Sequence, residues 1–253
     1  MANPPEYKTP DNMRIYAIGD VHGHLDLLIK MHQVIFNDLD ENPPGQARII
    51  TLGDYIDRGP DSRGVIEYLI HAHDNDNGIG RDILRGNHED GMFEFLSNPL
   101  HEDWLHWGGI QTCESYGVSV DGDEALVMPD EKQRVAQAMI NALPDDHVTF
   151  LKSRPTSIVH GDYLFAHAGV NPLIPLHEQT DKALTRMRQP FLNWHQADEY
   201  TPLPKKIVHG HSIEREPSNL PHRIGVDTCA FGRGVLSAAV LDGDDVRFLQ
   251  VRG

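Results

Sequence analysis

The chain has 253 residues, of which 39% are hydrophobic and 24% charged, and this composition is typical of a globular protein with one large or two small α/β domains. Its formal net charge is −16, from 38 acidic and 22 basic residues. We therefore expect no binding to nucleic acid or anionic membranes, because both need a basic surface. The sequence contains neither a long apolar run nor a basic, apolar leader, which predicts a cytoplasmic protein without a membrane span.

The first 90 residues predict strands that alternate with helices. Short apolar runs at 14–18, 48–52 and 81–84 are expected to be strands. Apolar residues at helical spacing predict helices at 25–39 and 62–72. This order is typical of a parallel central sheet, in which functional side chains lie beyond the carboxyl ends of the strands.

The rest of the chain changes character twice. Residues 91–150 are expected to form a helical excursion that leans over the functional site, with Trp104 and Trp107 as packing residues rather than as a wall for substrate. A hairpin is predicted at 157–166. Later strands are expected at 207–208, 223–227, 235–241 and 246–251. We expect this β-rich part to form a second sheet against the first.

Three glycine-bounded motifs follow the first three predicted strands. They are GDVHG at 19–23, GDYIDRG at 53–59 and GNHE at 86–89. An isolated Asp or His at a strand end is usually an ordinary turn residue. Three such groups in order, at the spacing of βαβ units, predict instead one shared site that binds two metal ions and cleaves phosphate.

Six side chains are candidate metal ligands: Asp20, His22, Asp54, Asn87, His167 and His211. We expect Asp54 to bridge the two ions. Carboxylate, amide and imidazole donors without sulfur suit Mn²⁺, Fe or Zn²⁺, and we expect Mn²⁺ to serve in vitro. Two divalent ions with only two carboxylate ligands leave a net charge of about +2, which suits a phosphate dianion and a hydroxide that bridges the ions.

Cleavage of a phosphate ester also needs a proton for the leaving alkoxide. His88, next to Asn87, is the natural donor. Asp57 can fix the tautomer of His88 and raise its pKa. Arg58 can hold the phosphate with two parallel hydrogen bonds. The second and third motifs therefore predict a general acid and a phosphate-binding group beside the metal ligands.

These motifs resemble the phosphoprotein phosphatase family of calcineurin-like metallophosphoesterases, whose pattern is GDxHG, GDxxDRG, GNHE and two later histidines. FAHAG at 165–169 and HGH at 209–211 resemble the later pair. The resemblance covers residues 14 to about 230 and is closest to bacterial and phage serine/threonine protein phosphatases. The segment 228–232 (TCAFG) lacks the tyrosine-bearing loop of the eukaryotic members.

The resemblance implies a single domain at 1–253 with an α/β fold (α+β by some schemes), in which helices flank a β-sandwich of two mixed sheets in four layers. It implies metal ligation by the six candidates above, with Asn87 also near the phosphate, and acid catalysis by His88 with Asp57. It further implies a second phosphate-binding arginine besides Arg58. Arg188 fits this role best, and Arg186 is the alternative. His209 is either a neighbour of the ligands or a structural residue.

Three functions are considered for this site. The first is a metal-dependent phosphomonoesterase of the serine/threonine protein phosphatase type, in which a hydroxide that bridges two metal ions attacks the ester directly. Its substrate would be a phosphorylated protein, a peptide or a small phosphate ester. The alternative is a nucleotide hydrolase that resembles bis(5'-nucleosyl)-tetraphosphatases. A non-catalytic metal-binding protein is disfavoured, because every position that the chemistry needs is filled. Oligomeric state is not predicted.

Overall fold

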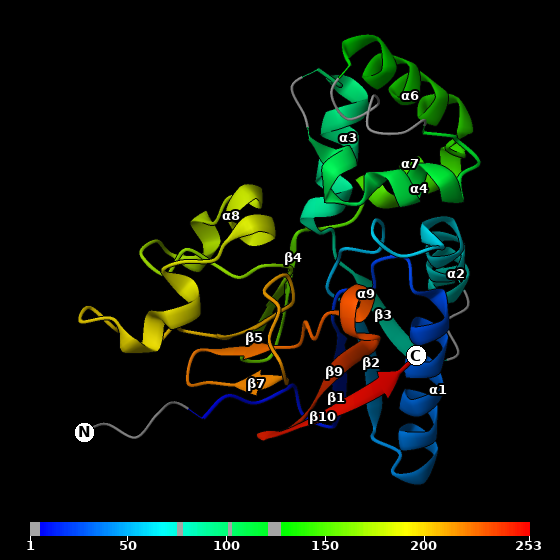
Figure 1. Cartoon of the computed structure of the whole chain (residues 1–253). Helices are drawn as coiled ribbons and strands as arrows, with labels where there is room; N and C mark the ends of the chain where they lie inside the picture. Colours follow the sequence, from blue (N-terminus) through cyan, green and yellow to red (C-terminus); the bar gives the residue numbers. More distant parts are fainter. Residues whose placement is uncertain (1–5, 75–77, 101–102, 121–127) are drawn as a thin grey trace.

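Two five-stranded sheets form the centre of the protein in the computed structural model, which describes residues 6–74, 78–100, 103–120 and 128–253. The first sheet has the strand order β10-β9-β1-β2-β3 and the second β4-β5-β6-β8-β7 (Figure 1). The first contains β1 (Met13–Ile18), β2 (Gln46–Thr51), β3 (Ile79–Ile83), β9 (Val235–Asp242) and β10 (Asp245–Arg252). The second contains β4 (Ser157–His160), β5 (Tyr163–Ala166), β6 (Lys206–His209), β7 (Ser218–Asn219) and β8 (Arg223–Gly225).

Parallel pairing brings the ends of the motif-bearing strands together. In the first sheet β1, β2 and β3 are parallel, and Ile18 at the end of β1 lies opposite Thr51 at the end of β2. Helices α1 (Leu25–Glu41) and α2 (Ser62–Asp74) connect these strands. In the second sheet β5, β6 and β8 are parallel as well. In each sheet the carboxyl ends of the parallel strands therefore lie at one edge, and the loops that follow them can come together there.

The alternation of side chains along the strands builds the layers. Ile15 and Ala17 of β1 pack into the cluster between the two sheets, with Phe165 and Val208 of the second sheet. The intervening residues of β1, such as Tyr16, pack on the opposite side against α1 and α2. The outer face of the second sheet is covered by the segment that holds α8 (Asp181–Arg186), η2 (Leu176–Glu178) and η3 (Phe191–Gln196). The predicted sandwich of two mixed sheets flanked by helices is thus confirmed.

One predicted feature of the sheets is wrong. Strands β9 and β10 belong to the first sheet, where β9 lies antiparallel to β1 with Ile15 opposite Leu241. The physical reason is that β9 is buried on both faces along almost its whole length. It therefore needs a position between two strands, covered on both sides, and alternation in the sequence does not say which sheet offers that position.

The predicted helical excursion consists of α3 (Asn87–Ser97), η1 (Trp104–Trp107), α4 (Gly109–Ser115), α6 (Pro129–Ala142) and α7 (Asp145–Lys152). These helices gather at one end of the first sheet (Figure 1). Helix α3 begins at Asn87, so the excursion starts inside the third motif rather than at 91. That residues 1–253 form a single domain stays a prediction.

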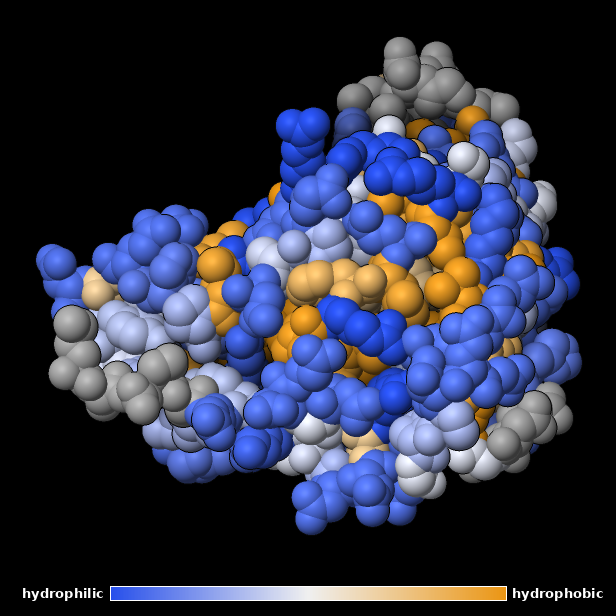
Figure 2. Space-filling view, turned by 90° about the horizontal axis from the view of Figure 1, so that it is seen from below, coloured by the Kyte–Doolittle hydropathy of each residue, from blue (hydrophilic) through white to orange (hydrophobic). Residues whose placement is uncertain are grey.

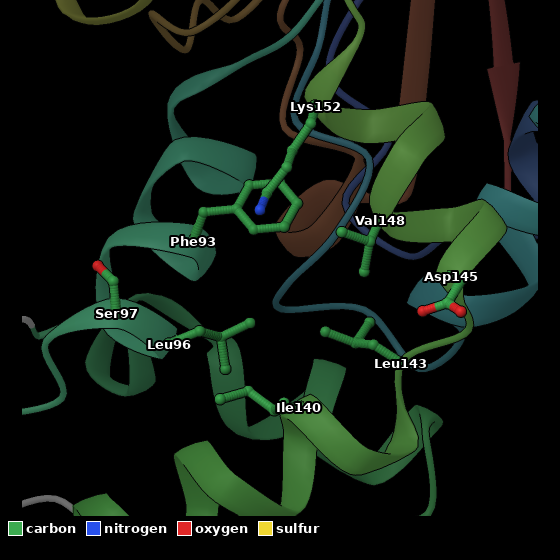
Figure 3. Close-up of a pocket in the computed structure, with 8 residues that line it drawn as sticks. All are labelled: Phe93, Leu96, Ser97, Ile140, Leu143, Asp145, Val148 and Lys152. Atoms are coloured by element: carbon green, nitrogen blue, oxygen red, sulfur yellow. The ribbon is translucent and has the colours of Figure 1, made fainter.

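Helices α3, α6 and α7 leave an apolar groove of about 350 Å³ between them (Figure 3). Leu96 of α3 and Ile140 of α6 line it, and Lys152 lies over the Phe93 ring, 4.9 Å from its centroid. None of the predicted metal ligands lines this groove. It is therefore separate from the motifs at the strand ends.

The surface seen from below is mainly hydrophilic, with hydrophobic side chains gathered near its middle (Figure 2). In the part of the chain that the structure describes, no helix combines the length and the apolar character needed to cross a bilayer.

Candidate metal centre

Loops at the carboxyl ends of strands carry the predicted metal ligands. Asp20 and His22 follow β1, and Asp54 follows β2. His167 follows β5 of the second sheet, and His211 follows β6. Asn87 opens α3, after β3. All of these side chains are buried, apart from the half-buried His211.

The carboxylate of Asp54 lies at the centre of these ligands. Its Oδ2 is 3.2 Å from Nε2 of His167 and 3.7 Å from Nε2 of His22. Donor atoms within 4.8 Å of one another form two groups, His22 with Asp54 and His88, and Asp54 with His167 and His211. Because Asp54 belongs to both groups, it lies where one carboxylate could bridge two ions.

Backbone carbonyls orient two of the imidazoles. Nδ1 of His22 lies 2.8 Å from the carbonyl oxygen of Ile56, and Nδ1 of His167 lies 3.0 Å from that of Leu52. A carbonyl only accepts, so each Nδ1 carries the proton and donates it, which leaves Nε2 to face Asp54. This is the arrangement in which an imidazole binds a metal ion.

The charges of the histidines follow from their surroundings. Burial lowers the pKa of His22 to about 3 and that of His211 to about 2, so both imidazoles are neutral and can act as ligands. Burial also acts to lower the pKa of His167, but the charge of Asp54 outweighs it and raises that pKa to about 10. A divalent ion bound at Nε2 would displace the proton of His167.

Asp20 lies beside the two groups rather than within them. Both of its carboxylate oxygens lie 3.0 Å from the backbone nitrogen of His211, which donates to them. Burial, and then the charge of Asp227, raise the pKa of Asp20 well above its ordinary value. Asp227 is itself only 4% exposed. Buried carboxylates this close together are unfavourable without a cation, so the donor set fits divalent metal ions.

His88 and Asp57 form the predicted pair. Nδ1 of His88 lies 2.6 Å from Oδ2 of Asp57. Burial acts to lower the pKa of His88, yet the charge of Asp54 and the hydrogen bond to Asp57 together raise it above the ordinary value. The raised pKa favours the protonated form, in which Nε2 of His88 lies 3.8 Å from Oδ2 of Asp54.

Two residues outside the predicted site hold the Asp57 carboxylate. The indole Nε1 of Trp104 donates to Oδ2 at 2.8 Å, and the hydroxyl of Thr112 donates to Oδ1 at 2.7 Å. Trp104 is fully buried, as a packing residue should be, but it also fixes the orientation of Asp57. Both donors lie about 50 residues beyond Asp57, and no local pattern in the sequence connects them.

Arg58 extends across the site between two imidazoles. Its Nη1 lies 3.1 Å from Nε2 of His22, and its Nη2 lies 3.1 Å from Nε2 of His88. The guanidinium also stacks on the ring of Phe231, 4.3 Å from its centroid. Gly108 makes this placement possible, because a Cβ at that position would lie 2.6 Å from the backbone nitrogen of Arg58.

A cavity of about 320 Å³ opens over these groups. It is lined by Arg58, Asn87, His88, Trp107, Arg186, Arg188 and His211. Trp107 packs against the core, as predicted, and also faces the cavity. Nη2 of Arg188 lies 3.5 Å from the carbonyl oxygen of His211, whereas Arg186 pairs with Glu94 at 3.0 Å.

His209, whose role the sequence left open, lies away from the two groups of ligand atoms. Its Nε2 is 3.2 Å from Nη1 of Arg223, and its ring packs edge-on against Phe191. Burial, and next the charge of Arg223, lower its pKa to about 3. These contacts support a structural role within the second sheet.

Two buried carboxylates near the ligands had no assigned role. Glu89 accepts hydrogen bonds from the backbone nitrogens of Asp54 at 3.0 Å, Tyr55 at 2.7 Å and Gly86 at 2.8 Å. Burial, and then the charge of Asp54, raise the pKa of Glu89 to about 7. Asp227 follows β8 just as Asp54 follows β2, and its position after a strand is the signal that could have identified it.

The ligand loops have an unusual backbone. Five residues have positive φ values, namely His22 (45°), Asp54 (52°), Asp57 (74°), Arg58 (69°) and His211 (60°). Residues other than glycine rarely adopt this conformation, and surrounding structure must hold it in place. The backbone N–H groups of Asp54, Tyr55 and Ile56, which donate to Glu89, supply such a constraint for the loop after β2.

Glu89→Gln should therefore destabilise the protein and weaken metal binding. The amide NH₂ of glutamine would face backbone N–H donors, and leaving one buried donor unpaired costs about 1–3 kcal/mol. We expect the melting temperature to fall by about 2–4 °C for each kcal/mol. The measurements are thermal unfolding and metal content, with Glu114→Gln on the exposed side of α4 as a control. An unchanged melting temperature would contradict the role of Glu89.

Comparison with known proteins agrees with this geometry. A family model described as calcineurin-like phosphoesterase matches residues 13–232. The chain is 25% identical over 240 residues to an asymmetrical bis(5'-nucleosyl)-tetraphosphatase of Oceanobacillus iheyensis, which covers 87% of this chain and 86% of that protein. A crystal structure provisionally described as a diadenosine tetraphosphatase superposes with a TM-score of 0.63 at 22% identity, over 98% of this chain and 99% of the other.

Two other relatives match over shorter segments. The chain is 27% identical over 177 residues to a zinc-dependent endopolyphosphatase of Saccharomyces cerevisiae, and the match covers 66% of this chain and 50% of the yeast protein. It is 30% identical over 95 residues to serine/threonine-protein phosphatase 1 of Salmonella typhimurium, which is 38% of each chain. The chain thus spans half or less of these two proteins. Because the family model covers most of the sequence, the protein belongs to the calcineurin-like phosphoesterase family and is a hydrolase.

Proposed function

We propose that the protein is a metal-dependent phosphomonoesterase of the serine/threonine protein phosphatase type. The observation that carries this proposal is the His88–Asp57 pair, 2.6 Å apart, whose imidazole adjoins the central carboxylate of Asp54. An alkoxide leaving from serine or threonine is a strong base and needs a proton as the ester bond breaks. A buried, oriented and protonated imidazole supplies that proton.

Two divalent ions complete the proposed site. Asp20, His22 and Asp54 would hold one ion, while Asp54, Asn87, His167 and His211 would hold the other. When bound, the ions supply a water nucleophile of lowered pKa and positive charge for the phosphoryl oxygens. Nitrogen and oxygen donors suit Mn²⁺, with Fe or Zn²⁺ as alternatives, and the zinc-dependent yeast relative supports a transition metal.

Arginines 58 and 188 are the proposed phosphate-binding groups. Arg58 lies between the imidazoles of His22 and His88, where a phosphoryl group would meet both the metal ions and the acid. Arg188 lines the same cavity, and within the described part of the chain no carboxylate forms an ion pair with it. Arg186 is already paired with Glu94, which favours Arg188 for this role.

A bis(5'-nucleosyl)-tetraphosphatase is the second candidate function. The observation that favours it is the relative of that name, which aligns over 86% of its own length. Its reaction releases a nucleotide, whose phosphate is a much weaker base than an alkoxide. The same metal ligands could serve both reactions, so the site alone does not separate them.

A substrate panel tests the two functions. The Mn²⁺-loaded protein should hydrolyse phosphoserine and phosphothreonine peptides with a higher kcat/KM than diadenosine tetraphosphate. p-Nitrophenyl phosphate serves as a reference, because its small phenolate leaves without much help from an acid. A preference for the dinucleotide by orders of magnitude would replace the first function by the second.

His88→Asn should separate acid catalysis from metal binding. We expect kcat on a phosphoserine peptide to fall by about 10²–10⁴-fold, the usual contribution of a general acid. The loss on p-nitrophenyl phosphate should be much smaller. Asp57→Asn should show the same pattern in weaker form. Metal content, measured by elemental analysis, should stay at the wild-type value, and a loss of bound metal would make His88 a ligand instead of the acid.

Arg188→Ala should lower kcat/KM on p-nitrophenyl phosphate by about 10–100-fold, because it removes a charged hydrogen-bond donor to the phosphate. Arg186→Ala, two residues away, should have a smaller effect on this small substrate. Steady-state kinetics on both variants decides between the arginines. The reverse order of effects would assign the phosphate to Arg186.

A further inference from the structure

A second cavity adjoins the metal centre. It measures about 570 Å³ and shares two of its lining residues, Trp107 and Arg186, with the cavity over the metal ligands. Asp90 and Glu94 of α3 line one side, and the start and end of α8 line the other. These two helices lie on either side of β4 in Figure 1. We call this second cavity the α3–α8 trough.

The position of the acid relates the trough to the reaction. The ring of His88 lies edge-on to Trp107, with centroids 6.1 Å apart. Since His88 donates its proton to the leaving group, the leaving group must lie beside His88 and therefore beside Trp107. The guanidinium of Arg186 lies over the outer part of this wall, 5.6 Å from the ring centroid of Trp107. The trough therefore opens beside the expected position of the leaving group, with Trp107 and Arg186 as the wall that the two cavities share.

The charges of the trough are balanced. Its basic side chains are Arg85, Lys182 and Arg186, and its acidic side chains are Asp90, Glu94 and Asp181. Arg85 lies 2.6 Å from Asp90 and 3.8 Å from Asp181. Arg186 lies 3.0 Å from Glu94. Both guanidinium groups are thus already neutralised by carboxylates.

The charged side chains of the trough distinguish between two kinds of leaving group, a nucleotide and a peptide. In the trough a nucleoside polyphosphate would meet three carboxylates and a single cation, Lys182, that no carboxylate of the described residues pairs with. Two of these carboxylates are well exposed, with the side chain of Asp181 71% and that of Glu94 49% exposed. A peptide offers backbone donors and acceptors, and its basic side chains can approach those exposed carboxylates. The net charge of −16 on the whole chain acts in the same direction.

We propose that the α3–α8 trough is a leaving-group subsite for polypeptide, which accepts the chain that flanks a phosphoserine or phosphothreonine, favours basic flanking residues and disfavours polyphosphate. This inference rests on the proposed function and goes further, because it assigns substrate choice to Glu94 and Asp181. Neither residue touches the metal ligands.

The first test uses the wild-type, Mn²⁺-loaded protein. Phosphothreonine peptides with basic, neutral and acidic flanks are compared at low salt, each as kcat/KM divided by that for p-nitrophenyl phosphate. We expect the basic peptide to exceed the acidic one by about tenfold, since each exposed charge contact changes the rate by a few-fold. Equal values for all three peptides would overturn the subsite.

The second test changes the trough itself. Glu94→Gln combined with Asp181→Asn keeps the shape of both side chains and raises the charge of the trough by two. We expect kcat/KM for diadenosine tetraphosphate to rise about tenfold relative to that for the basic phosphopeptide. Asp40→Asn with Glu114→Gln, two exposed positions that do not line the trough, makes the same change in net charge. It should leave that ratio at the wild-type value.

The outcomes separate the two proposals. Failure to hydrolyse any phosphomonoester, p-nitrophenyl phosphate included, would reject the proposed function. Hydrolysis of phosphomonoesters with an unchanged ratio in the trough variant would reject only the subsite. An equal shift in the control variant would assign the preference to the field of the whole protein rather than to the trough. Melting temperatures of both double variants establish that they are folded.

Discussion

The buried carboxylate of Glu89 is the interaction on which the metal centre depends. It lies in the first turn of α3 and receives backbone N–H groups from Asp54, Tyr55 and Gly86. The loop after β2 and the start of α3 are therefore held by one side chain. The backbone nitrogen of His88 in turn donates to Oδ1 of Asp54 at 3.0 Å. The proposed acid, His88, and the central carboxylate of Asp54 thus share one rigid unit, and their spacing follows from it.

That unit is built from strained backbone, and the sandwich keeps it in place. Asp54 and Asp57 have positive φ values, which an isolated loop would relax. Packing between the two sheets fixes where the strands end, and the loops after β5 and β6 bring His167 and His211 against the loop after β2. Neither sheet alone completes the centre. The arrangement explains why the ligands are spread over nearly two hundred residues yet meet within a few ångströms.

Local patterns in the sequence predicted most of this centre. Contacts between residues far apart in the chain could not be predicted in this way. Asp20, Asp54 and His88 stand in glycine-bounded motifs directly after apolar runs, so local pattern located both the strands and the side chains. Trp104 and Thr112 hold Asp57 from a distant helical segment, and nothing near Asp57 in the sequence points to them. The same limit applies to β9, whose composition predicted a strand but not the sheet it joins. Pairing partners depend on global packing, which one sequence expresses only weakly.

The end of α8 gives two arginines, Arg186 and Arg188, different surroundings. The helix ends at Arg186, and the next residue, Met187, is already extended, with φ −65° and ψ 138°. Arg186 remains on the helix, against Glu94 and Trp107, while Arg188 turns toward His211. Arg186 is ion-paired and lines both the trough and the cavity over the predicted metal ligands, whereas Arg188 lines that cavity but not the trough. The end of the helix at Arg186 thus leaves Arg188 in an extended segment that reaches His211, where the proposed phosphate-binding role requires it.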